Sequence, residues 1–482
     1  MWLPNPAAPL SWRLDLRFDQ PVRPTVRLEA PDHEVVLPFA ESALEHDLAL
    51  LGVAPRRVYT VTIEADGQVW PLVGGLLTPP LPDRFPIVEL LTADPDRMAP
   101  GVTLTDLKVP TSEVAYLAAF DAMGRVVWFW DVDADWGDTR ALDDYRLLGL
   151  SRTSATIANL FGGVEAVWTE APEAPHDIGV EWRAMHHEVH LLPDGGLLTL
   201  SESTVDVDDY PTTYTAPWVG EPATLDDPIV VELAPDGSTR RELRMSEILD
   251  TRRIGFDSLD LLGGSKRDWA HTNGLAIAPD GDWVISVRHQ DAVVKVSPEG
   301  ELRWILAPHA GWGEAWQEYL LEPVGPLTWP AHQHAPEVLE DGTIVVLDNG
   351  RWRASPYDGP QPEDHATYTR AVAYRVEGRT VEQLWEVVTP LYSAALGDAD
   401  VQPGGTVLMH LGFLDADETG DHASLGWGRK ALRLIEVHPD TPDAPVWDLR
   451  LRSDLAAESQ GWKGYRGERL PSLYPPGVLR GE

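Results

Sequence analysis

The fold is decided by the stretch DWAHTNGLAIAPDGDWVISVRHQD, residues 268–291. It reads as polar residues, a short apolar strand, a Pro-Asp-Gly turn, a second apolar strand and a polar end, which predicts a β-hairpin turning at Asp280. Because the two ends of a hairpin lie side by side, we expect His271 and Asn273 to lie near Arg288. An imidazole, an amide and a guanidinium would then share one sheet edge, and that set suits an anionic ligand.

The same pattern occurs twice more, at residues 185–203 and 331–350. The three copies align on the aspartate of the turn. Three positions can then be compared between the copies. Nine residues before the aspartate stand Met185, His271 and His332, and seven residues before it stand His187, Asn273 and His334. Eight residues after it stand Glu202, Arg288 and Asn349. A polar residue that recurs at one register of a repeat points to a shared face, usually the binding face.

The composition indicates a globular protein with no general attraction to nucleic acids or membranes. The chain has 482 residues, of which 43% are hydrophobic, so it is long enough for more than one domain. Asp and Glu number 77 against 38 Lys and Arg, and the formal net charge of −39 argues against non-specific nucleic-acid binding. An anionic substrate must therefore be attracted by a local cluster. No cysteine is present, which excludes disulfides and thiol nucleophiles.

The chain shows no sign of a membrane span or an export signal. No apolar run approaches the ~18 residues that a transmembrane helix needs. Residues 1–6 lack the basic and apolar parts of a signal peptide, so we expect a cytoplasmic location, or a periplasmic or secreted one if a leader has been trimmed. We expect no cofactor and no metal. The oligomeric state stays open, with a homodimer as one expectation.

Residues 1–85 are predicted to form a small β-sandwich. Short strands are read at residues 11–18, 25–29, 35–39 and 58–63. Residues 46–63 resemble a strand pair of a fibronectin type III domain, which favours the sandwich. The proline-rich TPPLPDRFP, residues 78–86, reads as a stiff linker and marks the domain boundary.

Residues 86–482 are predicted to form a β-propeller of about six blades. A second type of hairpin repeats beyond the linker and tends to follow a hairpin of the first type. Its copies lie at residues 114–130, 230–237, 293–305, 372–379 and 432–440. Two hairpins make a four-stranded unit, and a ring of such units is a propeller. Residues 147–169 and 399–410 read as further units.

The combined motifs resemble those of the bacterial arylsulfate sulfotransferases, the enzymes that do not use an adenosine phosphosulfate donor. The likeness covers most of the chain and is carried by Trp-x-His-x-Asn at 269–273, Ser-x-Arg-His-Gln at 286–290, His-His-Glu at 186–188 and Gln-His at 333–334. It implies an all-β fold, a six-bladed propeller preceded by a fibronectin-like sandwich. It also implies transfer of a sulfuryl group from a phenyl sulfate ester to a phenol through a sulfohistidine.

The resemblance carries over residue by residue. The nucleophile of the family matches His334, the Trp-x-His-x-Asn pair matches His271 and Asn273, and the arginine of Ser-x-Arg matches Arg288. The upstream histidine best matches His187. Family members carry an export signal and usually cysteines, and this chain shows neither. That departure bears on location rather than on chemistry.

The residue types suit these roles. A neutral imidazole attacks without a base, and the nearby Arg288 cation would hold the pKa of His334 down. The planar fork of Arg288 fits the three sulfuryl oxygens. We expect His271 to stabilise the leaving phenolate or to take the proton of the acceptor phenol. Asn273 and His332 are assigned to substrate binding.

A structural role remains the alternative for each residue. His334 can be a hairpin-end histidine bonded to backbone, and His332 competes with it as the nucleophile. Arg288 can form a salt bridge at a blade edge. His187 sits among His186 and His190, of which only one should face the site.

Two other functions are alternatives for the same residues. The first is a metal-dependent propeller hydrolase whose ligands are His187, His271, His332 and His334. Against it, Arg288 is a poor neighbour for a cation, and acidic residues do not recur at the site register. The second is a non-catalytic propeller scaffold, but an interaction face rarely needs three converging histidines and an arginine. We therefore expect phenolic sulfate donors and phenol acceptors as partners, and no nucleic acid.

Overall fold

The computed structural model describes residues 3–110, 113–132, 136–181, 184–362, 368–415, 430–453 and 461–480. Within these residues the regular structure is almost entirely strand, so the predicted all-β class is confirmed. Helix is limited to α1 (Met245–Ile248), η1 (Arg288–Gln290) and η2 (Glu314–Tyr319) among the described residues. No helix found in these ranges is both long and apolar enough to cross a membrane.

The N-terminal strands form two sheets that share one core. The first has the order β1-β2-β5 and consists of β1 (Leu3–Pro4), β2 (Trp12–Val22) and β5 (Ala43–Leu50). The second has the order β4-β3-β6-β7, with β8 also paired to β6; it consists of β3 (Thr25–Ala30), β4 (His33–Pro38), β6 (Val58–Ala65), β7 (Gln68–Pro71) and β8 (Leu76–Leu77). In β6, Tyr59, Val61 and Ile63 are buried and alternate with more exposed residues, the period of two expected of a strand.

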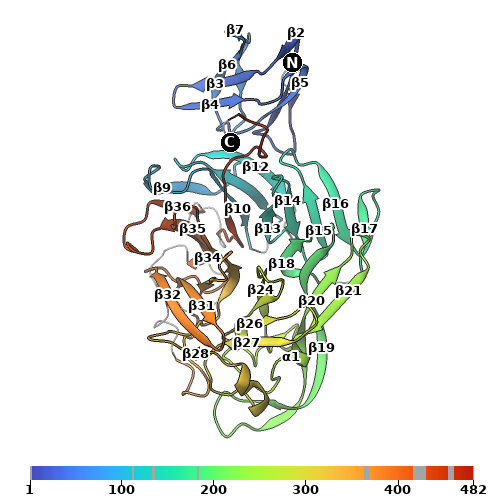
Figure 1. Cartoon of the computed structure of the whole chain (residues 1–482), viewed down its shortest axis with the longest axis vertical. Helices are drawn as coiled ribbons and strands as arrows, with labels where there is room; N and C mark the ends of the chain where they lie inside the picture. The colour runs from blue at the N-terminus through green and yellow to red at the C-terminus, as the bar shows by residue number, and fades with distance from the viewer. Residues whose placement is uncertain are drawn as a thin grey trace.

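The remaining strands of the described residues form six sheets arranged in a propeller-like ring (Figure 1). The first holds β10 (Val102–Lys108), β11 (Ala115–Phe120), β12 (Val126–Val132) and β37 (Gly467–Leu470). The second holds β13 (Thr139–Ala141), β14 (Leu147–Leu150), β15 (Ser154–Ala158), β16 (Val164–Thr169) and β17 (Asp177–Gly179). The third holds β18 (His186–Leu191), β19 (Leu197–Pro211), β20 (Gly220–Leu233), β21 (Thr239–Arg244), β22 (Leu261–Leu262) and β23 (Lys266–Arg267).

The other three sheets complete the ring. The fourth holds β24 (Thr272–Ile277), β25 (Trp283–Val287), β26 (Ala292–Val296) and β27 (Leu302–Leu306). The fifth holds β28 (Glu322–Pro323), β29 (His334–Val338), β30 (Ile344–Asp348), β31 (Arg370–Glu377) and β32 (Thr380–Val388). The sixth holds β33 (Asp398–Val401), β34 (Val407–Asp415), β35 (Lys430–Val437), β36 (Trp447–Arg452) and β9 (Ile87–Ala93).

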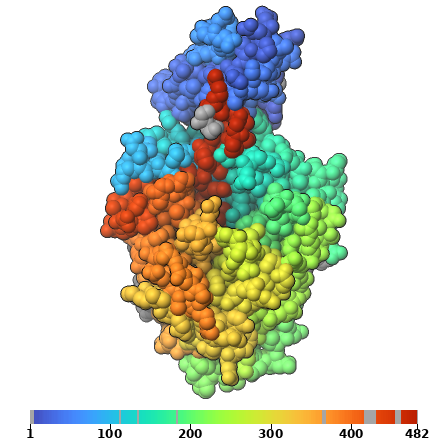
Figure 2. Space-filling view, in the orientation of Figure 1, coloured from blue at the N-terminus to red at the C-terminus, as the bar shows by residue number. Residues whose placement is uncertain are grey.

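Strands from the two ends of the ring segment close it. β9, the first strand after the proline-rich linker, pairs with β36 of the last sheet, and β37, from near the end of the chain, pairs with β10 of the first sheet. The chain then runs from the ring to the N-terminal sheets, where Arg480 N donates to the carbonyl of Pro38. Figure 2 shows this C-terminal segment in red between the two parts of the molecule. The ends of the ring are therefore held by hydrogen bonds between segments far apart in sequence.

One strand of each sheet lines the centre. β24 contacts β18 and β29, β29 contacts β33, and β13 contacts β37. The buried guanidinium of Arg466 lies among them, with Nε 2.6 Å from Asp138, Nη2 2.9 Å from Glu188 and Nη1 3.3 Å from Asp398. A buried cation is tolerated only when it is paired in this way, so Arg466 ties the inner strands of several sheets together.

The hairpin predicted over residues 268–291 is present. β24 and β25 pair antiparallel, with Thr272 opposite Val287 and Ile277 opposite Trp283. At the open end, the backbone N–H of Arg288 donates to the carbonyl of His271 at 3.2 Å. The polar ends of the hairpin therefore lie side by side, next to the centre of the ring.

Candidate active site

Each of the three repeated hairpins carries a β-bulge beside its histidines. The register shifts between His186 and Val189, between Thr272 and Gly274, and between His334 and Glu337. The backbone is left-handed at His187 (φ 63°) and at His271 (φ 48°), a conformation uncommon outside glycine. A bulge re-aims the side chains around it, and here it turns imidazoles toward the centre of the ring.

Three imidazoles from three sheets meet there. The ring of His187 lies 5.4 Å from that of His271 and 6.1 Å from that of His334, measured between centroids. Tyr465, which precedes β37, lies 6.0 Å from His187 and 5.0 Å from His334. The structure therefore brings together His187, His271 and His334, and adds a tyrosine from near the end of the chain.

His334 presents an unprotonated nitrogen. Its Nδ1–H donates to the carbonyl oxygen of Gly397 at 2.7 Å, and because a carbonyl can only accept, the proton of the neutral ring lies on Nδ1. Nε2 is buried and has no hydrogen-bond partner among the described residues. Burial, with the positive charges of Arg466 and Arg288, lowers the pKa of His334 to about 3. The Nε2 lone pair is therefore free at neutral pH.

His332 has the opposite environment. Its Nδ1 lies 2.9 Å from Asp291 Oδ1, and its Nε2 lies 3.1 Å from the carbonyl of Phe256 and 3.4 Å from Asp257 Oδ2. Burial alone would lower the pKa of His332, but the two carboxylates raise it above the ordinary value. Both ring nitrogens are occupied by protein acceptors, which leaves His332 no lone pair for a ligand.

His271 is held by a carboxylate. Its Nδ1 lies 2.7 Å from Oδ2 of Asp268, and its side chain is 29% exposed. Asp268 itself is buried; burial would raise its pKa, but the hydrogen bond from His271 and the positive charge of Arg288 hold the pKa well below the usual range. An ionised Asp268 fixes the orientation of His271 with Nε2 directed away from it, an arrangement suited to proton transfer.

His187 is supported by its neighbour. Nδ1 of His187 lies 2.7 Å from Nδ1 of His186. Burial and the neighbouring histidines lower the pKa of His187 well below the ordinary value. His190 lies at the other end of β18, where its Nε2 contacts the carbonyl of Leu275 at 2.7 Å. Of the three upstream histidines, His187 is the one whose ring packs against His271 and His334.

Arg288 is buried at the edge of the histidine cluster. Nη2 donates to the carbonyl of Ala394 at 3.3 Å, and Nη1 lies 2.7 Å from Nε2 of His289. The nearest carboxylate, that of Asp257, is 3.9 Å away. The guanidinium is thus oriented mainly by neutral acceptors and keeps its positive charge available for an anion.

The side chain of Asn273 lies at the edge of the site and also forms hydrogen bonds that hold the hairpins together. Its Nδ2 donates to the carbonyl of Gln333 at 2.9 Å, and its Oδ1 accepts from Ser286 Oγ at 2.7 Å. These bonds tie β24 to the residue before His334. The amide has two N–H donors, so one remains beyond the bond to Gln333.

A cavity of about 150 Å³ adjoins the cluster. Its walls combine apolar and polar residues: Ala184, Met185, Pro228 and Leu262 with Arg152, His186, His187, Glu202, Asp226, Asp268, His271 and Thr272. A cavity of this size holds a single benzene ring. The site is therefore large enough for a phenyl group beside the imidazoles.

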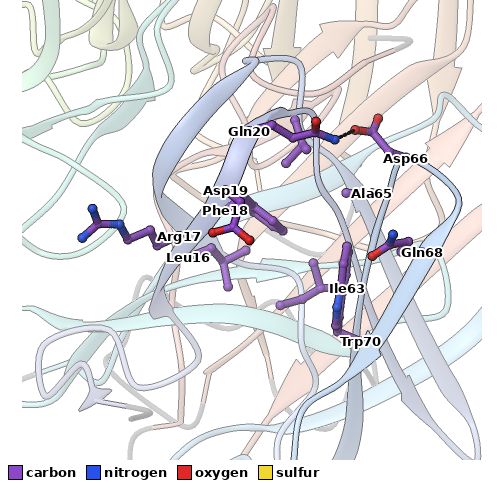
Figure 3. A pocket seen from close by; sticks show the side chains of 11 residues that line it. Leu16, Arg17, Phe18, Asp19, Gln20, Ile63, Ala65, Asp66, Gln68 and Trp70 are labelled. Carbon is purple, nitrogen blue, oxygen red and sulfur yellow. Dashed lines mark hydrogen bonds between the residues drawn. The ribbon is translucent and has the colours of Figure 1, made fainter.

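A larger cavity, of about 480 Å³, lies between the N-terminal sheets (Figure 3). It is lined only by residues between 16 and 70, with Phe18, Ile63 and Trp70 on its walls and a 3.3 Å hydrogen bond from Gln20 to Asp66 at its rim. Neither histidine nor any convergent set of titratable groups lines it.

The site residues fit a metal poorly. Among the residues that the structure describes, two groups have ligand atoms within 4.8 Å of one another, and both include His289: Asp257 with His289 and His332, and Asp268 with His271 and His289. However, Nε2 of His289 already accepts an N–H of Arg288. A metal ion would have to displace a buried guanidinium and lie beside its charge. The arrangement favours an anion over a cation.

Sequence reasoning missed several contributors. Asp268 stood three residues before His271 in the deciding stretch, so the spacing alone could have suggested the pair. Gly397 precedes β33, and Tyr465 and Arg466 precede β37, so they belong to other parts of the ring and no local pattern connects them to the histidines. Only the closure of the ring by β37 brings Tyr465 to the centre.

The fold and site together define a class of protein: an all-β, propeller-like ring with imidazoles from three sheets at its centre, one of which has a free nitrogen, and a buried guanidinium at their edge. The profile of the Arylsulfotransferase (ASST) family matches residues 88–463, which is most of the chain. The chain therefore belongs to the arylsulfotransferase family, a family of transferases.

Individual relatives match only part of the chain. The chain is 34% identical over 150 residues to an arylsulfate sulfotransferase AssT of Lelliottia amnigena, covering 26% of this chain and 24% of the relative. A protein of the same name from Escherichia coli O6:H1 is 34% identical over 152 residues, with 26% and 24% covered. The chain thus spans about a quarter of the length of these curated relatives.

The matches among solved structures have low sequence identity. A protein of unknown function from Bacteroides caccae is 13% identical with a TM-score of 0.43, covering 77% of this chain and 98% of its own. A virginiamycin B lyase from Staphylococcus aureus is 8% identical with a TM-score of 0.33, covering 67% of this chain and 95% of its own.

Proposed function

We propose that the protein transfers a sulfuryl group from a phenolic sulfate ester to a phenol by a ping-pong mechanism, through a sulfohistidine on His334. The observation that carries the proposal is the free Nε2 of His334, buried within reach of neighbouring histidines and of the field of Arg288. A neutral imidazole needs no base to become a nucleophile, whereas Ser or Thr would. The absence of cysteine removes the thiol alternative.

In the first half-reaction the Nε2 lone pair of His334 forms a bond to sulfur. The bond between sulfur and the aryl oxygen breaks, and its electron pair leaves with the phenolate. In the second half-reaction the oxygen of the acceptor phenol bonds to sulfur, the nitrogen–sulfur bond breaks, and the lone pair returns to Nε2. The phenolic proton passes to a base in the site.

The other residues take roles that fit their contacts. Arg288 and the remaining N–H of Asn273 hold the sulfuryl oxygens, whose charge persists through the transfer. His271, oriented by Asp268, protonates the departing phenolate and later accepts the proton of the phenol. His187 closes the site from the other side. His332, with both nitrogens occupied, supports Asp257 and Asp291 beside Arg288 rather than contacting substrate.

The finer description of the fold belongs to the same proposal. We assign the six sheets to a six-bladed β-propeller over residues 86–482, and the two N-terminal sheets to a fibronectin-like β-sandwich over residues 1–85. The support is the closure of the ring by β9 and β37 and the core shared by the N-terminal sheets. In this arrangement His187, His271 and His334 come from one end of the inner strands, and Arg288 follows β25, the strand paired with β24.

Acceptors should be phenols rather than aliphatic alcohols or water. A site that expels a phenolate in one half-reaction is complementary to a phenol in the other, because the two steps share one type of transition state. The phenyl-sized cavity beside His187 and His271 supports this selectivity.

Incubation with 4-nitrophenyl sulfate, with and without phenol, tests the proposal. We expect release of nitrophenolate to depend on phenol, phenyl sulfate to form in equal amount, and double-reciprocal plots at several phenol concentrations to be parallel. Release that is equally fast without phenol would make the protein a sulfatase. Intersecting lines would indicate direct transfer between donor and acceptor.

A further inference from the structure

Arg288 and the residue after it form a buried pair within one short turn. Both belong to η1, which follows β25 and ends at Asp291 in a left-handed conformation (φ 46°). Arg288 is 4% exposed and His289 is 3% exposed. Nη1 of Arg288 lies 2.7 Å from Nε2 of His289, a normal hydrogen-bond distance. The side chain of one residue is thus the direct partner of its neighbour.

The tautomer of His289 follows from its other contact. Its Nδ1 lies 2.7 Å from the backbone carbonyl of Asp268, which can only accept, so Nδ1 carries the proton. Nε2 therefore has a lone pair, and the contact with Arg288 is a donation from the guanidinium to the imidazole. Burial lowers the pKa of His289 to about 3, which keeps the ring neutral.

We propose that His289 is a positioning residue for Arg288: held by the carbonyl of Asp268, its neutral imidazole accepts one N–H of the guanidinium and fixes the fork toward the sulfuryl oxygens. This inference rests on the proposed sulfuryl transfer. It adds to the site a residue that does not itself contact the substrate.

A neutral acceptor suits this position better than a carboxylate. A carboxylate at 2.7 Å would orient the guanidinium equally well, but it would also cancel the charge that an anionic sulfuryl group needs. The carboxylate of Asp257 stays 3.9 Å from Arg288 and is itself engaged by Arg351 and Trp352, each at 2.8 Å. The imidazole of His289 gives direction without neutralising the charge.

His289 also connects Arg288 with His271. His289 stacks on His271, with centroids 4.6 Å apart and an interplanar angle of 26°. Asp268 holds His289 through its carbonyl and His271 through its carboxylate. One residue therefore sets the positions of both the sulfuryl-binding arginine and the proton-transferring histidine.

Two amide substitutions separate the contacts of His289. In His289→Gln, the side-chain oxygen can take the place of Nε2 and accept from Arg288. In His289→Asn, the shorter amide can replace Nδ1 and donate to Asp268 O, but it leaves Arg288 without its acceptor. We expect kcat for transfer from 4-nitrophenyl sulfate to phenol to fall about 100-fold in the Asn variant and less than about 10-fold in the Gln variant, since small misplacements of a binding group cost that much.

A double-mutant cycle with Arg288→Ala gives a readout that a structural role would not move. If His289 acts through Arg288, His289→Asn should have little further effect on kcat once Arg288 is alanine. The matched control is His190→Asn, which removes another imidazole, a partly buried one on β18, that is bonded to a backbone carbonyl, that of Leu275. It should leave kcat near the wild-type value.

The outcomes are distinct. No phenol-dependent turnover by the wild-type protein would overturn the proposed function and this inference with it. With wild-type turnover present, equal rates for the Gln and Asn variants, or additive losses in the cycle, would overturn the inference alone. If the Asn variant melts below the assay temperature, His289→Ala takes its place in the cycle, and a rate for it equal to that of His289→Gln again counts against the inference.

Discussion

Replacing Asp268 with asparagine should weaken proton transfer by His271 while leaving the nucleophile in place. The buried carboxylate of Asp268 lies 2.7 Å from Nδ1 of His271 and fixes the direction of Nε2. An asparagine amide can present its NH₂ group instead, which favours the other tautomer of the imidazole. The rate of transfer should therefore fall most with donors whose leaving phenolate needs a proton.

The magnitude follows from the type of bond. Hydrogen bonds to charged groups are worth about 1.5–3 kcal/mol, which corresponds to a loss of about 10- to 150-fold in rate. We expect this full loss in kcat/KM with phenyl sulfate as donor, because phenolate is a poor leaving group. With 4-nitrophenyl sulfate, whose phenolate leaves without a proton, the loss should stay below about 10-fold.

The assay compares the two donors with one acceptor. Transfer to 1-naphthol is measured by liquid chromatography of naphthyl sulfate for wild type and Asp268→Asn. The control is Asp227→Asn, because Asp227 is a buried carboxylate that accepts from Ser246 N at 3.0 Å and Oγ at 2.8 Å, away from the histidines. The control substitution should change kcat/KM equally for both donors or leave it unchanged. Equal losses for the two donors in Asp268→Asn would refute the role of Asp268 in proton transfer.

Three further outcomes follow from the contacts. Arg466→Met should lower stability by about 3–5 kcal/mol, because it removes one of the two cations, Arg466 and Arg140, that pair with the buried carboxylates of Asp138 and Glu188; an unchanged urea midpoint would contradict this. Burial lowers the pKa of His410 to about 3. Below about pH 6.5 the unfolded chain therefore binds a proton at this histidine that the folded chain does not bind. The free energy of unfolding consequently decreases as the pH falls below that value. Between pH 7 and pH 5, the free energy of unfolding of His410→Gln in urea titrations should therefore fall by about 2 kcal/mol less than that of the wild type. An equal fall in the two proteins would refute the lowered pKa of His410. Dialysis against EDTA should leave turnover unchanged, since Arg288 occupies the nitrogen of His289 that a metal would need; loss restored by zinc would favour a metal-dependent hydrolase.

The sequence predicted those features that depend on local periodicity. The hairpin over residues 268–291 is encoded by two apolar strands around a Pro-Asp-Gly turn, and it forms as expected. The nearness of His271 to Arg288 follows from that hairpin alone. The all-β class follows from the repetition of such units along the chain.

The bulges could not be predicted, and they decide which histidine faces the site. His332 and His334 are two residues apart, so a regular strand would place both on one face. The left-handed backbone at His332 (φ 49°) and at Ala335 (φ 43°) breaks that alternation. His332 consequently turns to Asp291, while His334 turns to Gly397. Contacts between sheets, such as that of Tyr465 with His334, depend on the closure of the ring and leave no local signal.

The most direct test of the proposed mechanism is mass spectrometry of the protein after donor is added without acceptor, with acid avoided during digestion. We expect one added sulfuryl group on the peptide that holds residues 331–342, lost again when phenol is added. The adduct should be absent from His334→Ala and present in His332→Ala. No adduct on any peptide, or an adduct that persists in His334→Ala, would contradict a sulfohistidine on His334.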